Sequence, residues 1–170
     1  MTRGFWLSSL GLLALAAAPL ATAQTYVANQ AAQKTAVLTV VAGSDNANGG
    51  LNFNGGVRGS KTFVVPLGWK VELRFRNNAM APHSVIVINS GPIPSGLTPG
   101  LAAFPGAAGR NLAQGFGMNM GGGSAPDDTL RFTASKAGKY TIACGVPGHA
   151  VAGQYIGLEV SASATEASFR

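Results

Sequence analysis

The stretch CGVPGHAVAGQ at residues 144–154 places a thiol, an imidazole and a side-chain amide five residues apart. On both sides of it, in 139–144 and 154–160, apolar residues alternate with polar or small ones, as they do in a half-buried strand. The glycines and Pro147 predict a tight turn between these strands. We therefore expect a strand–turn–strand unit that brings Cys144, His149 and Gln154 to one end of a β fold.

The remaining histidine completes a metal-ligand set. The chain has one cysteine and two histidines, and the second imidazole, His83, stands at the head of the β-branched run SVIVI at 84–88. Two imidazoles, one thiolate and a weak fourth donor are the ligands of a trigonal electron-transfer copper site. Zinc usually takes four strong ligands in a tetrahedron, and Gln154 offers only an amide oxygen. The sequence therefore predicts one copper ion held by His83, Cys144, His149 and Gln154.

These residues resemble the cupredoxin (blue copper) family, whose usual ligand pattern is Cys, His and Met. The motifs NFNG at 52–55, VPLGWKV at 65–71 and FRN at 75–77 narrow the resemblance to the sulfocyanin branch, over roughly residues 36–160. The resemblance implies a Greek-key β-sandwich with a type 1 copper ion that carries one electron. Sulfocyanins have an axial Met where this chain has Gln154. Stellacyanin-like cupredoxins use Gln there, which implies a lower reduction potential.

The N-terminal residues 1–23 have the pattern of a signal peptide. Arg3 precedes an apolar run at 4–20, and Ala-Thr-Ala at 21–23 is typical of a cleavage site. The alternative is an uncleaved membrane anchor, but the run is short and is interrupted by Pro19. We therefore expect a mature chain that begins at Gln24 and is periplasmic or extracellular. A single cysteine excludes an internal disulfide.

The mature chain is expected to hold one all-β domain. Short runs of β-forming residues separated by Gly, Pro and Asn predict an antiparallel sandwich at 36–161. Residues 24–35 are interpreted as a polar lead, either a short helix or a flexible arm, and 162–170 as a frayed tail. Asn52 and Asn54 are interpreted as turn residues, although they could also tie the copper loops together. We expect a monomer.

A long loop at 90–126, rich in glycine and proline, interrupts the predicted strands. Loops of this length are uncommon in compact domains unless they have a function or are mobile. Met118 and Met120 in it could bind Cu(I), offer another axial donor or form a docking surface. The simpler interpretation, which we favour, is that they pack the loop onto the sandwich.

The net charge of +6 comes from dispersed lysines and arginines. Nucleic-acid binding would need a clustered basic stripe with aromatic residues, which the sequence lacks. The basic residues are either an ordinary solvated surface or a means of steering the protein toward an acidic redox partner or an anionic membrane.

Two histidines are too few for the catalytic copper of a multicopper oxidase or a copper nitrite reductase. Thiol catalysis by Cys144 and His149 lacks an orienting Asp or Asn in the loop. The chain is therefore predicted to be an electron carrier between redox proteins rather than an enzyme. The electron is expected to leave through His149, next to an apolar patch of Ala150, Val151 and Ala152. The alternative function is periplasmic copper binding and delivery.

Overall fold

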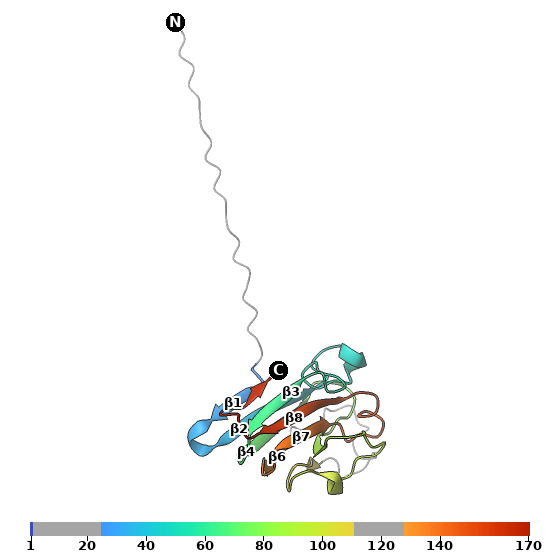
Figure 1. The fold of residues 1–170 in the computed structure, drawn as a ribbon. Helices are drawn as coiled ribbons and strands as arrows, with labels where there is room; N and C mark the ends of the chain where they lie inside the picture. Colours follow the sequence, from blue (N-terminus) through green and yellow to red (C-terminus); the bar gives the residue numbers. More distant parts are fainter. Residues whose placement is uncertain (2–24, 111–127) are drawn as a thin grey trace.

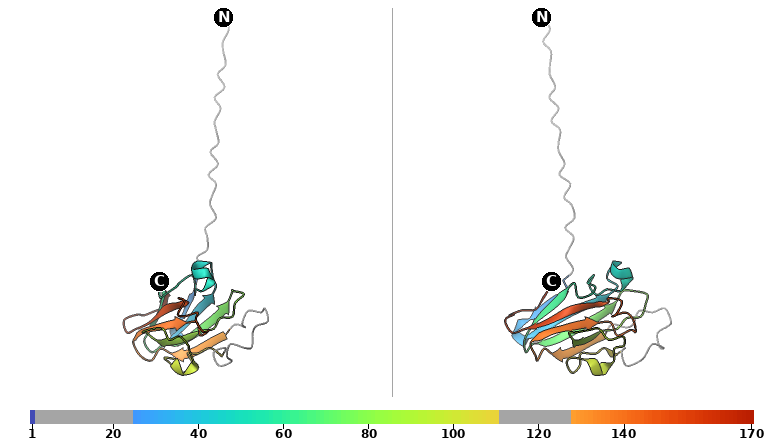
Figure 2. Two further views of the ribbon diagram at one scale, coloured as in Figure 1. Left: turned by 90° about the vertical axis from the view of Figure 1, so that its right-hand side faces the viewer. Right: turned by 45° about the vertical axis from the view of Figure 1, so that its right-hand side comes forward.

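The computed structural model describes Met1 and residues 25–110 and 128–170. Two β-sheets face one another in a sandwich (Figures 1 and 2). Short 3-10 helices lie in the connections, namely η1 (Ala31–Gln33), η2 (Ala47–Gly50) and η3 (Pro99–Leu101). The predicted all-β sandwich is confirmed. Apart from Met1, the predicted signal peptide at 1–23 lies outside the described residues.

The first sheet has four strands in the order β1-β2-β4-β6. They are β1 (Val27–Gln30), β2 (Thr35–Ala42), β4 (Lys70–Asn77) and β6 (Asp128–Thr133). Strict alternation in β4 buries Val71, Leu73 and Phe75 and leaves Lys70 and Arg74 exposed. The period of two residues thus separates an apolar inner face from a charged outer face.

The second sheet has five strands in the order β5-β7-β8-β3-β9. They are β3 (Thr62–Pro66), β5 (Ile86–Asn89), β7 (Gly138–Ala143), β8 (Tyr155–Ser161) and β9 (Ser168–Phe169). Their inward side chains, such as Phe63, Ile142 and Leu158, meet those of the first sheet in one core that also contains Cys144.

The predicted antiparallel pairing holds for most of the strand pairs in the described residues, but not for all of them. β2 pairs with β4 in parallel, and so does β3 with β8. The reason is the path of the chain, which leaves β2 for β3 in the other sheet and returns to β4. A strand reached through the opposite sheet can re-enter in the same direction, whereas a tight hairpin forces reversal.

Both ends of the domain also differ from expectation. The lead at 24–35 forms β1 and η1, and the tail at 162–170 is not frayed because β9 pairs with β3. The Phe169 ring packs 4.4 Å from that of Phe63 and 5.3 Å from that of Tyr26. Asn29 exchanges two hydrogen bonds with the main chain of Ala167, at 2.8 and 2.9 Å. Figure 1 shows β9 beside β1. The two ends therefore hold each other.

The described part of the predicted 90–126 loop packs on the sandwich. Isolated bridges join Ala102 to Ile88 and Ala108 to Ile86. The Phe104 ring is buried and stacks on Phe132, with 5.3 Å between the centroids. Met118 and Met120 lie outside the described residues. Within the described ranges no helix is long and apolar enough to cross a bilayer.

Candidate metal centre

The loop at 144–154 joins two adjacent antiparallel strands, as its sequence predicts. Cys144 follows the end of β7 and Gln154 precedes the start of β8. The Cys144 N–H donates to the carbonyl of Gln154 at 3.1 Å, and the Gln154 N–H donates to that of His149 at 2.9 Å. These bonds close the loop on itself at the right-hand end of the sandwich in Figure 1.

His83 reaches the same place from the connection between β4 and β5. It lies three residues before β5 rather than at its first residue. Its neighbour Ser84 ties the two loops together, because the Ser84 hydroxyl oxygen accepts a hydrogen bond from the Gly145 N–H at 3.0 Å. This hydrogen bond fastens the connection that carries His83 to the 144–154 loop.

The donor atoms of both histidines and the cysteine lie within reach of one another. The Cys144 Sγ is 3.8 Å from His83 Nδ1 and 3.7 Å from His149 Nδ1, and the two Nδ1 atoms are 3.2 Å apart. Metal bonds to imidazole nitrogen and thiolate sulfur are about 2.0–2.3 Å long, so donors that share one ion lie within about 4.6 Å. All three distances meet that condition.

Burial shapes the acid–base properties of the three donors. Cys144 is fully buried, His83 is 2% exposed and His149 is partly exposed. Burial raises the pKa of the Cys144 thiol to about 11, although hydrogen bonds from Ser84 and Val146 oppose this. Burial, and then the nearby His149, lower the pKa of His83 to about 4. Burial also lowers the pKa of His149. Both imidazoles are thus kept neutral, as metal ligands must be.

Gln154 supplies an unsatisfied oxygen beside these donors. Its side chain is fully buried, and its Nε2 donates to the main-chain carbonyl of Asn52 at 3.3 Å. Its Oε1 is the one buried side-chain nitrogen or oxygen in the described residues without a hydrogen-bond partner. The Gln154 side chain also partly opposes the lowering of the pKa of both histidines. An orphaned buried acceptor costs about 1–3 kcal/mol, and this cost disappears if the oxygen faces a cation.

The donor set fits copper better than zinc. It has two imidazole nitrogens and one sulfur, which match the three strong ligands of a trigonal copper site, and the unpaired amide oxygen of Gln154 is the candidate for the weak axial donor. Residues 25–110 and 128–170 place no carboxylate in this cluster. The residues present therefore fit the ion that the sequence predicts.

Some residues near the centre behave differently from expectation. Ala150 is 3% exposed and belongs to a small core cluster with Ile86, so it cannot line an apolar docking patch. Val151 is 57% exposed and Ala152 is also exposed. Asn52 and Asn54 are buried. The Asn54 side chain binds the main chain of Thr39 and Val41, and the Asn52 main-chain carbonyl accepts a hydrogen bond from the Gln154 side chain. Their interpretation as turn residues missed these contacts. The NFNG motif at 52–55 was the feature of the sequence that could have indicated these contacts.

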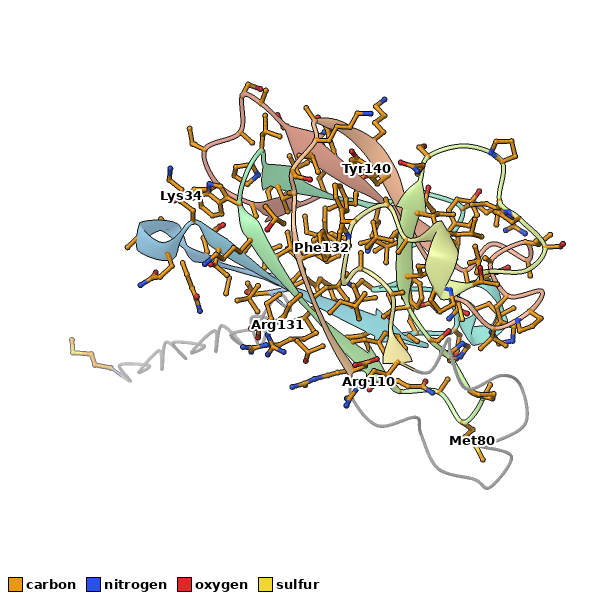
Figure 3. The ribbon with its side chains drawn as sticks, turned by 90° about the horizontal axis from the view of Figure 1, so that it is seen from below. Lys34, Met80, Arg110, Arg131, Phe132 and Tyr140 are labelled. Carbon is orange, nitrogen blue, oxygen red and sulfur yellow. The ribbon has the colours of Figure 1, made fainter. Side chains whose placement is uncertain are left out.

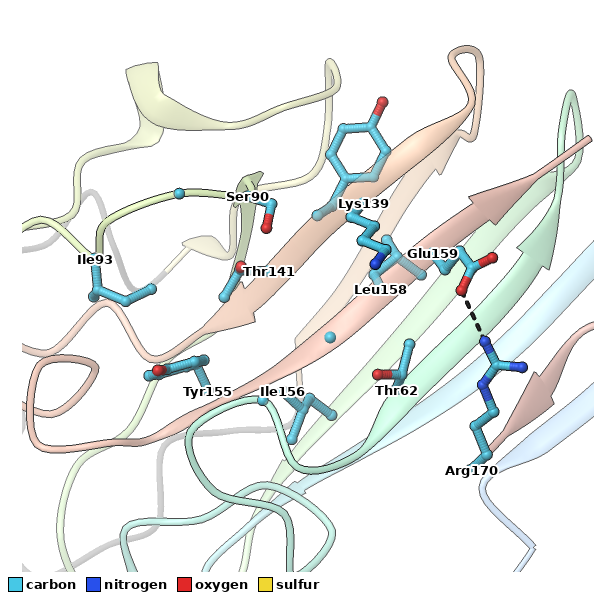
Figure 4. A pocket seen from close by; sticks show the side chains of 14 residues that line it. Thr62, Ser90, Ile93, Lys139, Thr141, Tyr155, Ile156, Leu158, Glu159 and Arg170 are labelled. Carbon is cyan, nitrogen blue, oxygen red and sulfur yellow. Dashed lines mark hydrogen bonds and ion pairs between the residues drawn. The ribbon is translucent and has the colours of Figure 1, made fainter.

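A separate pocket of about 380 Å³ opens on the outer face of the five-stranded sheet (Figure 4). Thr141 and Tyr155 lie along it, and the ion pair between Glu159 and Arg170, at 2.8 Å, borders it. None of the four candidate ligands lines this pocket, so it is not part of the metal centre.

Comparison with known proteins identifies the family of the chain. The profile of the "Sulfocyanin (SoxE) domain" matches residues 22–169. Sulfocyanin from Sulfolobus acidocaldarius is 31% identical over 139 residues, which cover 78% of this chain and 66% of the relative. The match thus spans slightly less than two thirds of the relative's length.

Solved structures were also matched, with TM-scores below 0.5. Auracyanin B is 21% identical with a TM-score of 0.49, over 80% of this chain and 94% of that one. Auracyanin A, a "blue" copper protein from Chloroflexus aurantiacus, is 21% identical with a TM-score of 0.46, over 75% and 99%. The profile match covers nearly all of the described residues, including all four candidate ligands. The chain belongs to the sulfocyanin family.

Proposed function

We propose that this protein is an exported mononuclear type 1 copper protein that carries single electrons between redox proteins. The observation that carries the proposal is the cluster of His83, Cys144 and His149, whose donor atoms lie 3.2–3.8 Å apart at a largely buried site. Family membership and the signal-peptide pattern at 1–23 support it.

The chain's own residues would hold the ion in a fixed environment. When bound, copper would supply a one-electron couple between Cu(II) and Cu(I). His83 and Cys144 exclude water through their burial, and the Ser84–Gly145 hydrogen bond keeps their two loops at a constant separation. A site that cannot rearrange suits electron transfer, because little protein motion accompanies each change of charge.

His149 is the candidate ligand that reaches the surface. Cys144, His83 and Gln154 are 0–2% exposed, whereas His149 is partly exposed and is followed by the exposed Val151. The route for electrons therefore runs through the His149 ring, with Val151 and Ala152 as the apolar contact for a partner.

A basic face on the four-stranded sheet supports an acidic partner. Lys70, Arg74 and Arg76 on β4 and Arg131 on β6 are all exposed on its outer side. Glu72 lies among them, 2.7 Å from Arg74 and 3.5 Å from Arg131. β4 ends at Asn77, where the connection carrying His83 begins, so this row of positive charge leads toward the metal centre. Charge arranged in this way steers an oppositely charged partner during encounter.

Copper delivery is the alternative function, and the burial of the donors argues against it. A carrier that hands over its ion exposes the ligands to an acceptor protein, but Cys144 is fully buried and His83 nearly so. Met118 and Met120, on which the delivery hypothesis depends, lie outside the described residues.

A copper titration tests the proposal. One equivalent of Cu(II) added to the purified apoprotein should produce an intense visible band, and Cys144→Ser should abolish it. Reversible voltammetry and slow loss of copper are expected as well. Rapid transfer of copper to a chelating acceptor without that colour would favour delivery and contradict the carrier.

The Gln154→Met substitution tests the fourth donor. A thioether favours Cu(II) less than an amide oxygen does, so the colour should remain and the reduction potential should rise. An unchanged potential would mean that Gln154 is not a ligand.

A further inference from the structure

Asn52 is held more firmly than a turn residue needs to be. Its side chain is fully buried, and its Oδ1 accepts hydrogen bonds from the Ser44 N–H at 3.2 Å, the Ser44 hydroxyl at 3.0 Å and the Gly55 N–H at 3.2 Å. Its Nδ2 donates to the carbonyls of Asp45 at 2.9 Å and Ala47 at 3.0 Å. Both the oxygen and the nitrogen of the Asn52 side-chain amide therefore have all their hydrogen bonds satisfied, and these bonds fix the residue in one position.

The main-chain carbonyl of this fixed residue is the partner of Gln154. Asn52 O accepts from Gln154 Nε2 at 3.3 Å and from the Gly43 N–H at 3.2 Å. A carbonyl can only accept hydrogen bonds, so it selects the nitrogen end of the Gln154 amide. The oxygen end, Oε1, then points away from Asn52 and has no hydrogen-bond partner.

We propose that Asn52 is a positioning residue for the fourth copper donor. Its side chain fixes the 44–55 loop, the loop fixes the Asn52 carbonyl, and the carbonyl turns the Gln154 oxygen toward His83 and His149. The chain of contacts extends from an exposed loop to a buried amide. The proposal rests on the proposed function, since it assumes that Gln154 Oε1 serves the metal.

Asn54 provides a matched control. It is also an asparagine, is 2% exposed, and accepts from the Val41 N–H at 2.6 Å and donates to the Thr39 carbonyl at 2.8 Å. Its own main-chain carbonyl accepts from Lys61 Nζ at 3.0 Å instead of from Gln154. Replacing Asn54 therefore removes two side-chain hydrogen bonds of a buried asparagine in the same motif, against five for Asn52, without removing a partner of the Gln154 amide.

The test compares Asn52→Ala and Asn54→Ala in two states of the full chain. In the apoprotein, the side-chain amide NMR signal of Gln154 should move in Asn52→Ala and stay in place in Asn54→Ala. In the copper-loaded protein, Asn52→Ala should shift the equilibrium toward Cu(I) about threefold, a rise in reduction potential of about 28 mV for one electron. The copper hyperfine splitting in the EPR spectrum should change with it.

A double substitution links the shift to Gln154. Once Gln154→Met has removed the amide, adding Asn52→Ala should leave the potential where Gln154→Met alone puts it. An additive shift would overturn the proposal, because Asn52 would then act by another route. Equal shifts in Asn52→Ala and Asn54→Ala would also overturn it.

The outcomes separate this proposal from the proposed function. A blue protein whose potential is the same with and without Asn52 overturns the positioning role and leaves the carrier intact. A wild-type protein that stays colourless with copper overturns the carrier itself. If Asn52→Ala does not fold, Asn52→Ser takes its place, and the absence of a shift there counts against the proposal.

Discussion

The two histidines of the metal centre differ in how the protein surrounds them. His83 is 2% exposed and comes from the crossing between the two sheets, where Ser84 ties it to the opposite loop. His149 lies at the middle of the 144–154 loop and is partly exposed. Their Nδ1 atoms are nevertheless only 3.2 Å apart. The metal centre therefore has a closed side, at the buried His83, and an open side, at the partly exposed His149.

This difference assigns separate tasks to chemically identical side chains. The closed side resists rearrangement, since moving His83 requires breaking the contact between two loops. The open side is where the proposed function places a partner, since the His149 ring is partly exposed to solvent. The burial of each imidazole, more than its identity as a ligand, decides what it contributes to electron transfer.

The largest expected effect comes from replacing each histidine by glycine, which leaves a cavity that added imidazole can fill only if solvent reaches it. His83→Gly and His149→Gly should each abolish the intense visible band of the copper protein. Added imidazole should restore the band only in His149→Gly, because that cavity opens to solvent while the other is closed. Absorption spectra of both variants with and without imidazole provide the measurement. Equal restoration in both would show that the two sides do not differ.

The apoprotein should lose stability as the pH falls from 7 to 5, mainly because of His83. The pKa of His83 is about 4 in the folded protein against 6.5 for an ordinary histidine. Between these values the unfolded chain binds a proton that the folded chain does not, so acid favours unfolding. The expected loss in the free energy of unfolding is on the order of 2 kcal/mol. Urea denaturation at the two pH values measures it.

His83→Gln, which does not titrate, is the control for this pH dependence. Its stability should change much less between pH 7 and pH 5 than that of the wild-type apoprotein. A variant that loses as much stability as the wild type would place the proton uptake elsewhere.

The donor cluster was predictable from the sequence because the ligands are rare residue types. One cysteine and two histidines leave few ways to build a soft metal site, and the glycines and Pro147 indicate the turn between them. The strands were predictable for a similar reason, since β4 and β8 alternate clearly between buried and less buried residues. Local pattern was enough in these regions.

Other features depend on contacts between distant segments, which local pattern does not record. The parallel pairing of β2 with β4 follows from the path through the other sheet. The tail residues 162–170 look frayed by composition, yet Phe169 packs between Phe63 and Tyr26. The basic face was hidden because Lys70 and Arg131 are far apart in sequence and lie on neighbouring strands. The prediction that Ala150 belongs to an exposed apolar patch is wrong because the loop turns that side chain inward.

The open side of the centre should be sensitive to charge at Val151. Val151→Asp introduces a carboxylate that must lose water when a partner contacts the His149 side, so electron exchange should slow several-fold while the visible spectrum stays the same. Leu67→Asp is a matched control, because Leu67 is also exposed but lies in the turn before β4, about 25 Å of strand from the His83 connection. NMR line broadening in mixtures of the oxidised and reduced protein measures the exchange rate.

Equal slowing by Val151→Asp and Leu67→Asp would mean that electrons do not leave through the His149 side. Met80, which is 97% exposed and projects from the connection that carries His83, would then become the next position to test (Figure 3).

The smallest expected effect concerns the basic face of the four-stranded sheet. Arg131→Glu reverses one charge on the outer side of the four-stranded sheet, and Lys139→Glu makes the same change on the outer side of the other sheet. The oxidation rate of the reduced protein by hexacyanoferrate(III), an anion, should fall about twofold more in Arg131→Glu at low salt. The difference should vanish at high ionic strength, because salt screens charges separated by more than about 10 Å. Identical rates for the two variants would show that only net charge matters, and the arrangement of positive charge along β4 would then have no part in bringing a partner to the metal centre.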